Sequence, residues 1–400
     1  MDGRQGTARR GRALRLNRPG TGKSEPENVI IDDGSRWAGR YVTLDGMRGI
    51  AALAVALFHY NISQARHGYV AVDFFFVLSG FVLCRAYLPR WEAGMGTWAF
   101  MKQRFIRLYP LFLVGLIVTT ISAISNRYTG KGDVYDYGMI AASLSFNVLM
   151  LPSPVTNTLF PLNVPAWSLF FELLANAALV MVLFRLPKVG LLAVCGFCAW
   201  WYVPVVIANE GGNLGAVWAQ VGTSVVRTAL SFTAGVLIGK LPQPETRRAG
   251  WAGMACLVAI AVILLLDPPA IPPAYYDLAC ALVLFPLLVW IGARCEPPRI
   301  VAPLAWFLGE VSYAVYAVHW ALMQPLRYFK DDLGYEPVLM GAVFLGCCVT
   351  LAWLSVRFID APIRRALNRR LGSPTRAAMD VRNRHSETSL AAVAKNAADR

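Results

Sequence analysis

The sequence predicts an all-α protein that crosses a membrane about ten times and keeps both termini in the cytoplasm. Of its 400 residues, 56% are hydrophobic and only 16% are charged, whereas soluble domains are about half apolar and about a quarter charged. Continuous apolar runs, each long enough to cross about 30 Å of hydrocarbon, recur along the chain. Because these runs are unbroken and do not alternate with polar residues, we expect helices and not a β-barrel.

Apolar segments of spanning length occur in ten places. They are 44–62, 68–88, 105–126, 167–185, 189–208, 222–240, 249–266, 275–293, 303–326 and 336–357. A further apolar stretch, 139–151, is only 13 residues long and is followed by PSPVTNT. It is short for a span, and counting it would move the basic C-terminal flank to the outside. We therefore predict an outer-face or re-entrant segment.

The basic residues indicate the orientation of the spans. The net charge of +14 lies mostly in the tails and in alternate loops, and basic loops stay in the cytoplasm. Residues 1–40 and 366–400 are predicted to be polar cytoplasmic tails, the first of them disordered, on either side of a membrane domain at 41–365. The charge therefore indicates a lipid bilayer as partner and no nucleic acid. The eight cysteines lie mainly in apolar runs, which indicates packing and neither disulfides nor a metal site.

The first predicted span carries an arginine and a histidine on one face. Arg48 and His59 are 11 positions apart, close to three helical turns, so they share a face and are separated by about 16 Å. Asp45 precedes Arg48 by three positions and is placed to pair with it. Ionisable groups are costly inside a membrane, so each is a candidate for function, with a helix–helix hydrogen bond as the simpler alternative.

Other ionisable residues are expected at the depth of His59. Counting helical rise from the outer ends of the spans places Asp73, Glu172 and His319 at that level. A carboxylate beside an imidazole fixes its tautomer and raises its basicity. We therefore predict His59 as a catalytic base held by Asp73 or Glu172. His319 is a further candidate, either for chemistry or for structure.

Four basic residues are expected near the cytoplasmic surface, namely Arg48, Lys102, Arg104 and Arg107, and the three arginines are the candidates for ligand binding. Guanidinium groups bind phosphate through paired hydrogen bonds, so this level suits a phosphate-bearing ligand. The positive-inside rule is the alternative explanation. Ser79 and Gly80, in DFFFVLSGF, are predicted to serve close helix packing and not nucleophilic catalysis.

Five segments form an ordered set along the chain: LDGMRGIAALAVALFH from Leu44, GYVAVDFFFVLSGFVL from Gly68, KQRFIRLYPLF from Lys102, VPAWSLFFELLAN from Val164 and SYAVYAVHW from Ser312. Together they resemble the bacterial membrane O-acyltransferases of acyltransferase family 3. The resemblance covers 44 to about 365. It implies transfer of an acyl group, often acetyl from acetyl-CoA, to a hydroxyl of a sugar or glycosylated molecule.

By position, the resemblance also assigns functional residues. The family's arginine and histidine fall on Arg48 and His59, its basic motif on Arg104 and Arg107, and its acidic residue on Glu172. Two departures are visible. Lys102 and Gln103 stand where the basic motif often has paired arginines, and Asp360, in FIDAPIRR, stands where the family commonly has glutamate.

The resulting hypothesis is a multi-pass enzyme of the inner or plasma membrane that acylates a carbohydrate or glycosylated acceptor. Acyl-CoA would serve as co-substrate, with its phosphates on the arginines and its thioester near His59, and no metal is expected. His59 would either deprotonate the acceptor or accept the acyl group itself. The alternative is a transporter of a glycan or lipid that uses the buried histidines and carboxylates as a proton relay. A structural or assembly protein is a third possibility.

Overall fold

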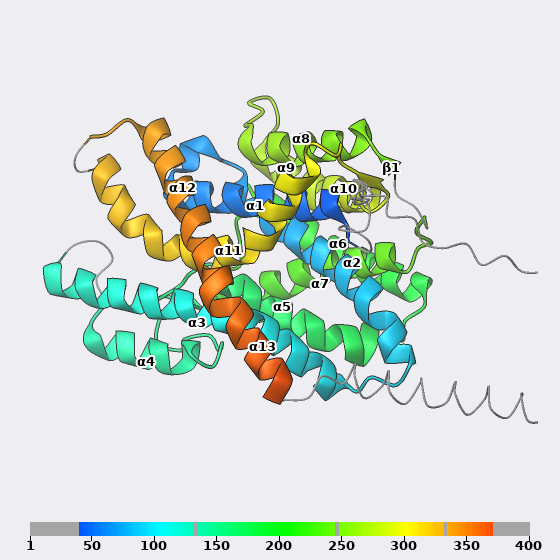
Figure 1. Cartoon of the computed structure of the whole chain (residues 1–400), viewed down its shortest axis with the longest axis horizontal. Coiled ribbons are helices and arrows are strands. Elements are labelled where there is room, and N and C mark those ends of the chain that lie inside the picture. Colours follow the sequence, from blue (N-terminus) through cyan, green and yellow to red (C-terminus); the bar gives the residue numbers. More distant parts are fainter. Residues whose placement is uncertain (1–39, 131–134, 245–247, 332–333, 371–400) are drawn as a thin grey trace, which may run out of the picture. The chain divides into compact units, whose positions relative to one another are not determined.

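The computed structural model describes residues 40–130, 135–244, 248–331 and 334–370. Helices make up most of these ranges (Figure 1). The strands found there are β1 (Arg248–Ala249) and β2 (Cys295–Glu296), which pair in parallel. The predicted all-α class is confirmed. The predicted tails lie outside the described residues, apart from Arg40 and from 366–370, which belong to the last helix.

A helix forms at each of the ten predicted positions. The helices are α1 (Val42–Tyr60), α2 (Ala71–Glu92), α3 (Thr97–Thr129), α5 (Ala166–Ala178) continued by η4 (Leu179–Leu183), α6 (Lys188–Ala208), α7 (Val221–Gly239), α8 (Trp251–Leu265), α9 (Pro273–Ala279) continued by η6 (Cys280–Leu284) and α10 (Phe285–Gly292), α11 (Ala302–Asp331) and α12 (Pro337–Ser355). Shorter elements are η2 (Ile62–Gln64), η3 (Gly68–Val70), η5 (Trp218–Gln220), η7 (Val356–Asp360) and α13 (Ala361–Arg370).

Within the described ranges, eight helical segments are long and apolar enough to cross a membrane. The other two of the ten positions are α8, which has only 15 residues, and α11. The chain is therefore a multi-pass membrane protein, whereas the number of crossings and the cytoplasmic placement of the termini stay predictions.

The apolar stretch at 139–151 forms the short helix α4 (Tyr137–Asn147). Its 11 residues extend about 16 Å, roughly half the thickness of the hydrocarbon layer. The helix begins where the Asp136 carboxylate accepts a hydrogen bond from the main-chain N–H of Met139. This length supports the prediction that the stretch does not span the membrane.

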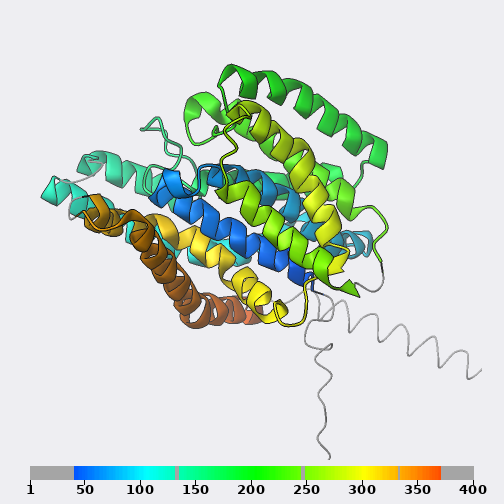
Figure 2. The ribbon, with the colours of Figure 1, turned by 90° about the horizontal axis from the view of Figure 1, so that it is seen from above.

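Helices α1 and α11 lie side by side in the interior of the helical domain (Figure 2). Gly309 lets them approach closely, because a Cβ atom there would lie 2.5 Å from the Cβ of Asp45. The two helices run in the same direction, since Arg48 contacts Ser312 and, farther along both helices, His59 contacts His319. This pair of helices carries much of the candidate site.

Helices α2 and α7 form a second close pair. A Cβ atom at Gly80 would lie 2.1 Å from the carbonyl oxygen of Phe232, so the predicted close packing at Gly80 is confirmed. Nearer the start of the same two helices, Asp73 and Arg227 form a buried ion pair with an Nη2–Oδ2 distance of 2.6 Å. The ion pair fixes α7 against α2, and α2 in turn lines the candidate site described below.

The turn between α1 and α2 is held by a charged network. The imidazole of His67 is buried, and its Nε2 lies 3.2 Å from Asp267 Oδ1 while its Nδ1 lies 3.6 Å from Asp277 Oδ1. Arg66 pairs with Asp267 as well, and the ring of Tyr276 packs on His67. Burial lowers the pKa of His67, but its hydrogen bonds and attraction to the two carboxylates outweigh this, so the pKa is raised.

This network predicts a pH-dependent contribution to stability. Because the pKa of His67 is raised in the folded protein, its contribution is complete below the unfolded value of about 6.5 and is lost as pH rises through the folded pKa. The thermal unfolding midpoint of the wild type should exceed that of His67→Gln at pH 6, and the difference should shrink by pH 9. A difference that grows with pH would contradict the assignment.

Candidate active site

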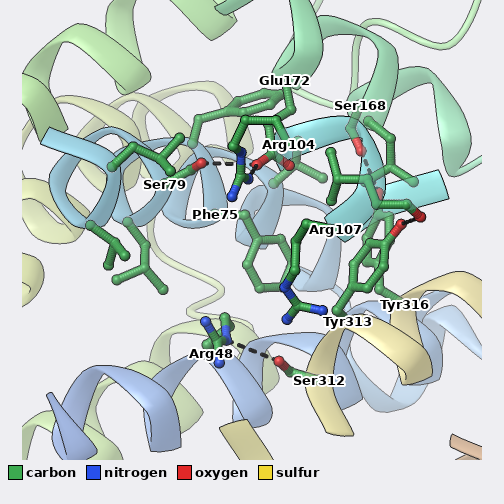
Figure 3. Close-up of a pocket in the computed structure, with 17 residues that line it drawn as sticks. Arg48, Phe75, Ser79, Arg104, Arg107, Ser168, Glu172, Ser312, Tyr313 and Tyr316 are labelled. Atoms are coloured by element: carbon green, nitrogen blue, oxygen red, sulfur yellow. Dashed lines mark hydrogen bonds and ion pairs between the residues drawn. The ribbon is translucent and has the colours of Figure 1, made fainter. Parts of the chain in front are cut away.

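A cavity of about 160 Å³ lies between α1, α2, α3, α5 and α11. It brings together the three arginines that the sequence singled out, Arg48, Arg104 and Arg107, together with Glu172 (Figure 3). Much of the remaining lining is apolar, contributed mainly by α2. The lining itself therefore offers three guanidinium groups, whose N–H donors suit an anionic ligand, although Asp45, Glu172 and Asp360 each pair with one of them.

Arg48 is fixed by α11 and by its own helix. Its Nη2 donates to Asp45 Oδ1 at 2.9 Å and to the carbonyl oxygen of Gly309 at 2.8 Å. Its Nε donates to Ser312 Oγ at 2.9 Å. The predicted Asp45–Arg48 pair is confirmed, and Ser312 is a contact that the sequence did not reveal.

Glu172 lies in the arginine cavity and not beside His59. Its Oε1 accepts hydrogen bonds from Arg104 Nη2 at 3.1 Å and from Ser79 Oγ at 2.9 Å. The prediction that Glu172 holds the His59 imidazole is therefore wrong. Helical rise gave a depth for each residue but not the direction of its side chain, and α5 turns Glu172 toward α2 and α3. Ser79 is likewise a cavity residue, beyond its predicted role in packing.

Asp73 is also engaged elsewhere. Both of its carboxylate oxygens accept hydrogen bonds from Arg227, and Oδ1 accepts a further bond from Ser231. The predicted pairing of Asp73 with His59 is therefore wrong. Asp73 pairs with Arg227 instead, because a buried guanidinium is always charged and needs a carboxylate beside it more than an imidazole does. The signal for Arg227 was present in the sequence: it is a charged residue in the middle of the 222–240 run, where a partner is required.

His59 is surrounded by rings among the described residues. Its imidazole stacks on that of His319, with ring centroids 5.4 Å apart and an interplanar angle of 20°. The indole of Trp320 lies edge-on at 5.2 Å. Arg327 donates to the main-chain carbonyl oxygens of His59 and Tyr60, which ties α11 to the end of α1. The expectation that His59 and His319 share one level is confirmed.

The tautomer of His319 follows from its neighbours. Its Nδ1 lies 2.8 Å from the carbonyl oxygen of Tyr316 and 3.2 Å from that of Val315. Carbonyl oxygens only accept, so Nδ1 carries the proton and Nε2 keeps its lone pair. Nε2 is buried and has no hydrogen-bond partner among the described residues. The stacked pair therefore contains an unprotonated, unpaired ring nitrogen.

One face of α11 connects the cavity to the histidine pair. Ser312, Tyr316 and His319 are spaced by four and three positions, so they share that face. Tyr316 lines the cavity, where its hydroxyl oxygen lies 2.6 Å from that of Ser168 in a hydrogen bond. The centroid of its ring lies 5.7 Å from that of the His319 ring. The arginine cavity and the histidine pair are thus neighbouring parts of one region.

The residues that the structure describes contain no cluster of three or more histidine, cysteine or acidic side chains placed to hold a metal ion. The groups available for chemistry among the described residues of this region are imidazoles, guanidiniums, hydroxyls and carboxylates.

The structure thus places an arginine cavity next to a histidine pair within a helical domain of a membrane protein. The chain belongs to the acyltransferase domain family, whose model matches residues 41–357. Family membership confirms the resemblance seen in the sequence and places the protein among the O-acyltransferases.

Several named relatives align with this chain, two of them over most of its length. Peptidoglycan O-acetyltransferase OatA of Listeria monocytogenes is 26% identical over 386 aligned residues, which cover 83% of this chain and 57% of OatA. Acyltransferase MdmB of Streptomyces mycarofaciens is 26% identical over 378, covering 83% of this chain and 93% of MdmB. Protein 2 in picA locus of Rhizobium radiobacter is 40% identical over 152, covering 34% of this chain and 80% of that protein. The chain thus spans little more than half the length of OatA. No solved structure matches it.

Proposed function

We propose that this protein, in the inner or plasma membrane, transfers an acyl group, in the first instance acetyl, from cytoplasmic acyl-CoA to a hydroxyl of a carbohydrate or glycosylated acceptor. The observation that carries the proposal is the arginine cavity adjoining the His59–His319 pair within a domain of the acyltransferase family. OatA and MdmB, named as an O-acetyltransferase and an acyltransferase, support the reaction class.

The cavity suits the donor at its phosphate-bearing end. Arg48, Arg104 and Arg107 supply N–H donors in the fork geometry that matches phosphate oxygens. Glu172 and Ser79 add acceptor oxygens to the same wall, which suits the amide N–H groups of a pantetheine arm. The apolar lining from α2 suits the methylene groups between them.

His59 would act where the thioester meets the acceptor. It takes the proton of the acceptor hydroxyl as that oxygen attacks the thioester carbonyl carbon. The carbon–sulfur bond then breaks, and the thiolate of CoA leaves and takes up a proton. His319, locked through Nδ1 to the backbone of its own helix, stacks on His59 and limits the rotation of its ring.

Purified protein in lipid nanodiscs, incubated with isotopically labelled acetyl-CoA and a panel of hydroxylated glycans and glycosylated small molecules, tests the proposal. We expect label on at least one acceptor and stoichiometric release of CoA. Transport of an unmodified glycan into proteoliposomes, without transfer to any acceptor, would replace the enzyme with the transporter alternative. Mass spectrometry of cell-envelope polysaccharides from a deletion strain and its parent would then identify the acceptor by a missing acyl increment.

A further inference from the structure

The junction between α12 and α13 departs from α-helical geometry. Val356–Asp360 form the π-helical turn η7, and such turns change the direction of the side chains that follow and frequently occur at functional sites. Arg357 and Phe358 are exposed, whereas Asp360 is only 1% exposed. The π turn therefore directs a carboxylate into the protein.

Two arginines share this buried carboxylate. Asp360 Oδ2 lies 2.9 Å from Arg364 Nη2, on the next helical turn, and 3.7 Å from Arg107 Nη1, on α3. Neither carboxylate oxygen has a hydrogen-bond partner among the described residues, so the contacts are ionic. Removal of a carboxylate from water is unfavourable unless opposite charges are well placed. Arg364 supplies one such charge, and Arg107 connects the carboxylate to the cavity.

Arg107 is held from two sides at the cavity wall. Its guanidinium lies over the ring of Tyr313, with Cζ 5.5 Å from the ring centroid, and it pairs with Asp360. Its side chain is 34% exposed, and it faces the same space as Arg48 from the opposite side (Figure 3). A guanidinium has five N–H donors, so pairing with Asp360 leaves donors for a ligand.

We propose that Asp360 is a positioning residue that fixes Arg107 toward the phosphate-bearing nucleotide end of the acyl donor, and so determines the preference for acyl-CoA over a thioester without a nucleotide. The inference rests on the proposed function. Without the carboxylate, the guanidiniums of Arg107 and Arg364 repel each other, and Arg107 loses the contact that orients it. Loss of the Asp360 carboxylate should therefore weaken donor binding without changing the chemistry at His59, because the ring contacts of the described residues connect His59 to the cavity indirectly, through His319 and Tyr316.

The test compares two donors, acetyl-CoA and acetyl-pantetheine, which lacks the nucleotide and its phosphates. With Asp360→Asn we expect KM for acetyl-CoA to rise about tenfold, the typical effect of one charge-assisted contact. We expect kcat for acetyl-CoA and kcat/KM for acetyl-pantetheine to stay unchanged. Asp360→Glu, which retains the charge, should recover most of the affinity. Arg357→Gln is the matched control, because it removes an exposed charge from the same π turn.

Equal loss with both donors, or a lower KM for acetyl-CoA in Asp360→Asn, would overturn the inference. If Asp360→Asn does not fold, Asp360→Glu carries the test. Because the longer side chain shifts the carboxylate, a rise in KM smaller than tenfold and confined to acetyl-CoA supports the positioning role, whereas an unchanged KM or parallel changes with both donors oppose it. A wild-type protein that uses neither donor refutes the proposed function instead, so the two failures are distinguishable.

Discussion

His59→Gln is expected to lower kcat/KM for acyl transfer by about 10²–10⁴-fold, the usual contribution of a positioned general base. Glutamine retains the approximate size and polarity of histidine but cannot take a proton. The variant therefore removes the base while it keeps much of the contact between this side chain and His319. The measurement is CoA release and acceptor labelling in nanodiscs, with the thermal unfolding midpoint recorded for each variant.

His67→Gln is the control for this variant, because His67 belongs to the network at the turn after α1 and does not line the cavity. It should retain transfer at a pH where the protein is folded. Full activity in His59→Gln would exclude His59 as the base. Label that remains on the wild-type chain after incubation with acetyl-CoA alone, and is absent from His59→Gln, would show that His59 accepts the acyl group before the acceptor does.

Arg227→Leu is expected to destabilise the fold by about 3–5 kcal/mol, the cost of leaving a buried charge without its partner. Asp73 would lose hydrogen bonds to both of its oxygens, and the carbonyl oxygen of Leu214 would lose its donor as well. The measurement is unfolding of the detergent-solubilised or nanodisc-embedded protein by heat or denaturant.

The double variant Asp73→Leu with Arg227→Leu separates structure from catalysis. Removing both charges leaves no unpaired ion, so much of the stability should return. If the double variant folds and transfers acyl groups, the ion pair is structural. A stable double variant without activity would instead indicate that Asp73 takes part in the reaction. A double variant as unstable as Arg227→Leu would show that packing, and not charge, dominates the stability at this position.

The helices were predictable because an apolar run of spanning length has few alternatives in a bilayer. The contact between Asp45 and Arg48 was predictable because it lies within one helix turn. Depth along a span correctly placed His59 and His319 at one level. Depth is a single coordinate, however. The neighbours of Glu172 and Asp73 also depend on how each helix is rotated and which helices lie beside it, and neither can be deduced from one sequence. The partner of Asp73 lies on α7, 154 positions away.

The parallel α1–α11 pair joins the two helices at two levels, at Arg48–Ser312 and at His59–His319. Between these contacts α1 has a fixed interval of 11 positions and α11 one of seven. Each added or deleted residue rotates everything beyond it by about 100°, which would put one contact out of phase with the other. The number of residues between the two contacts is therefore constrained as strictly as the identity of the contacting residues. We expect insertions and deletions in this domain to occur in the connecting turns.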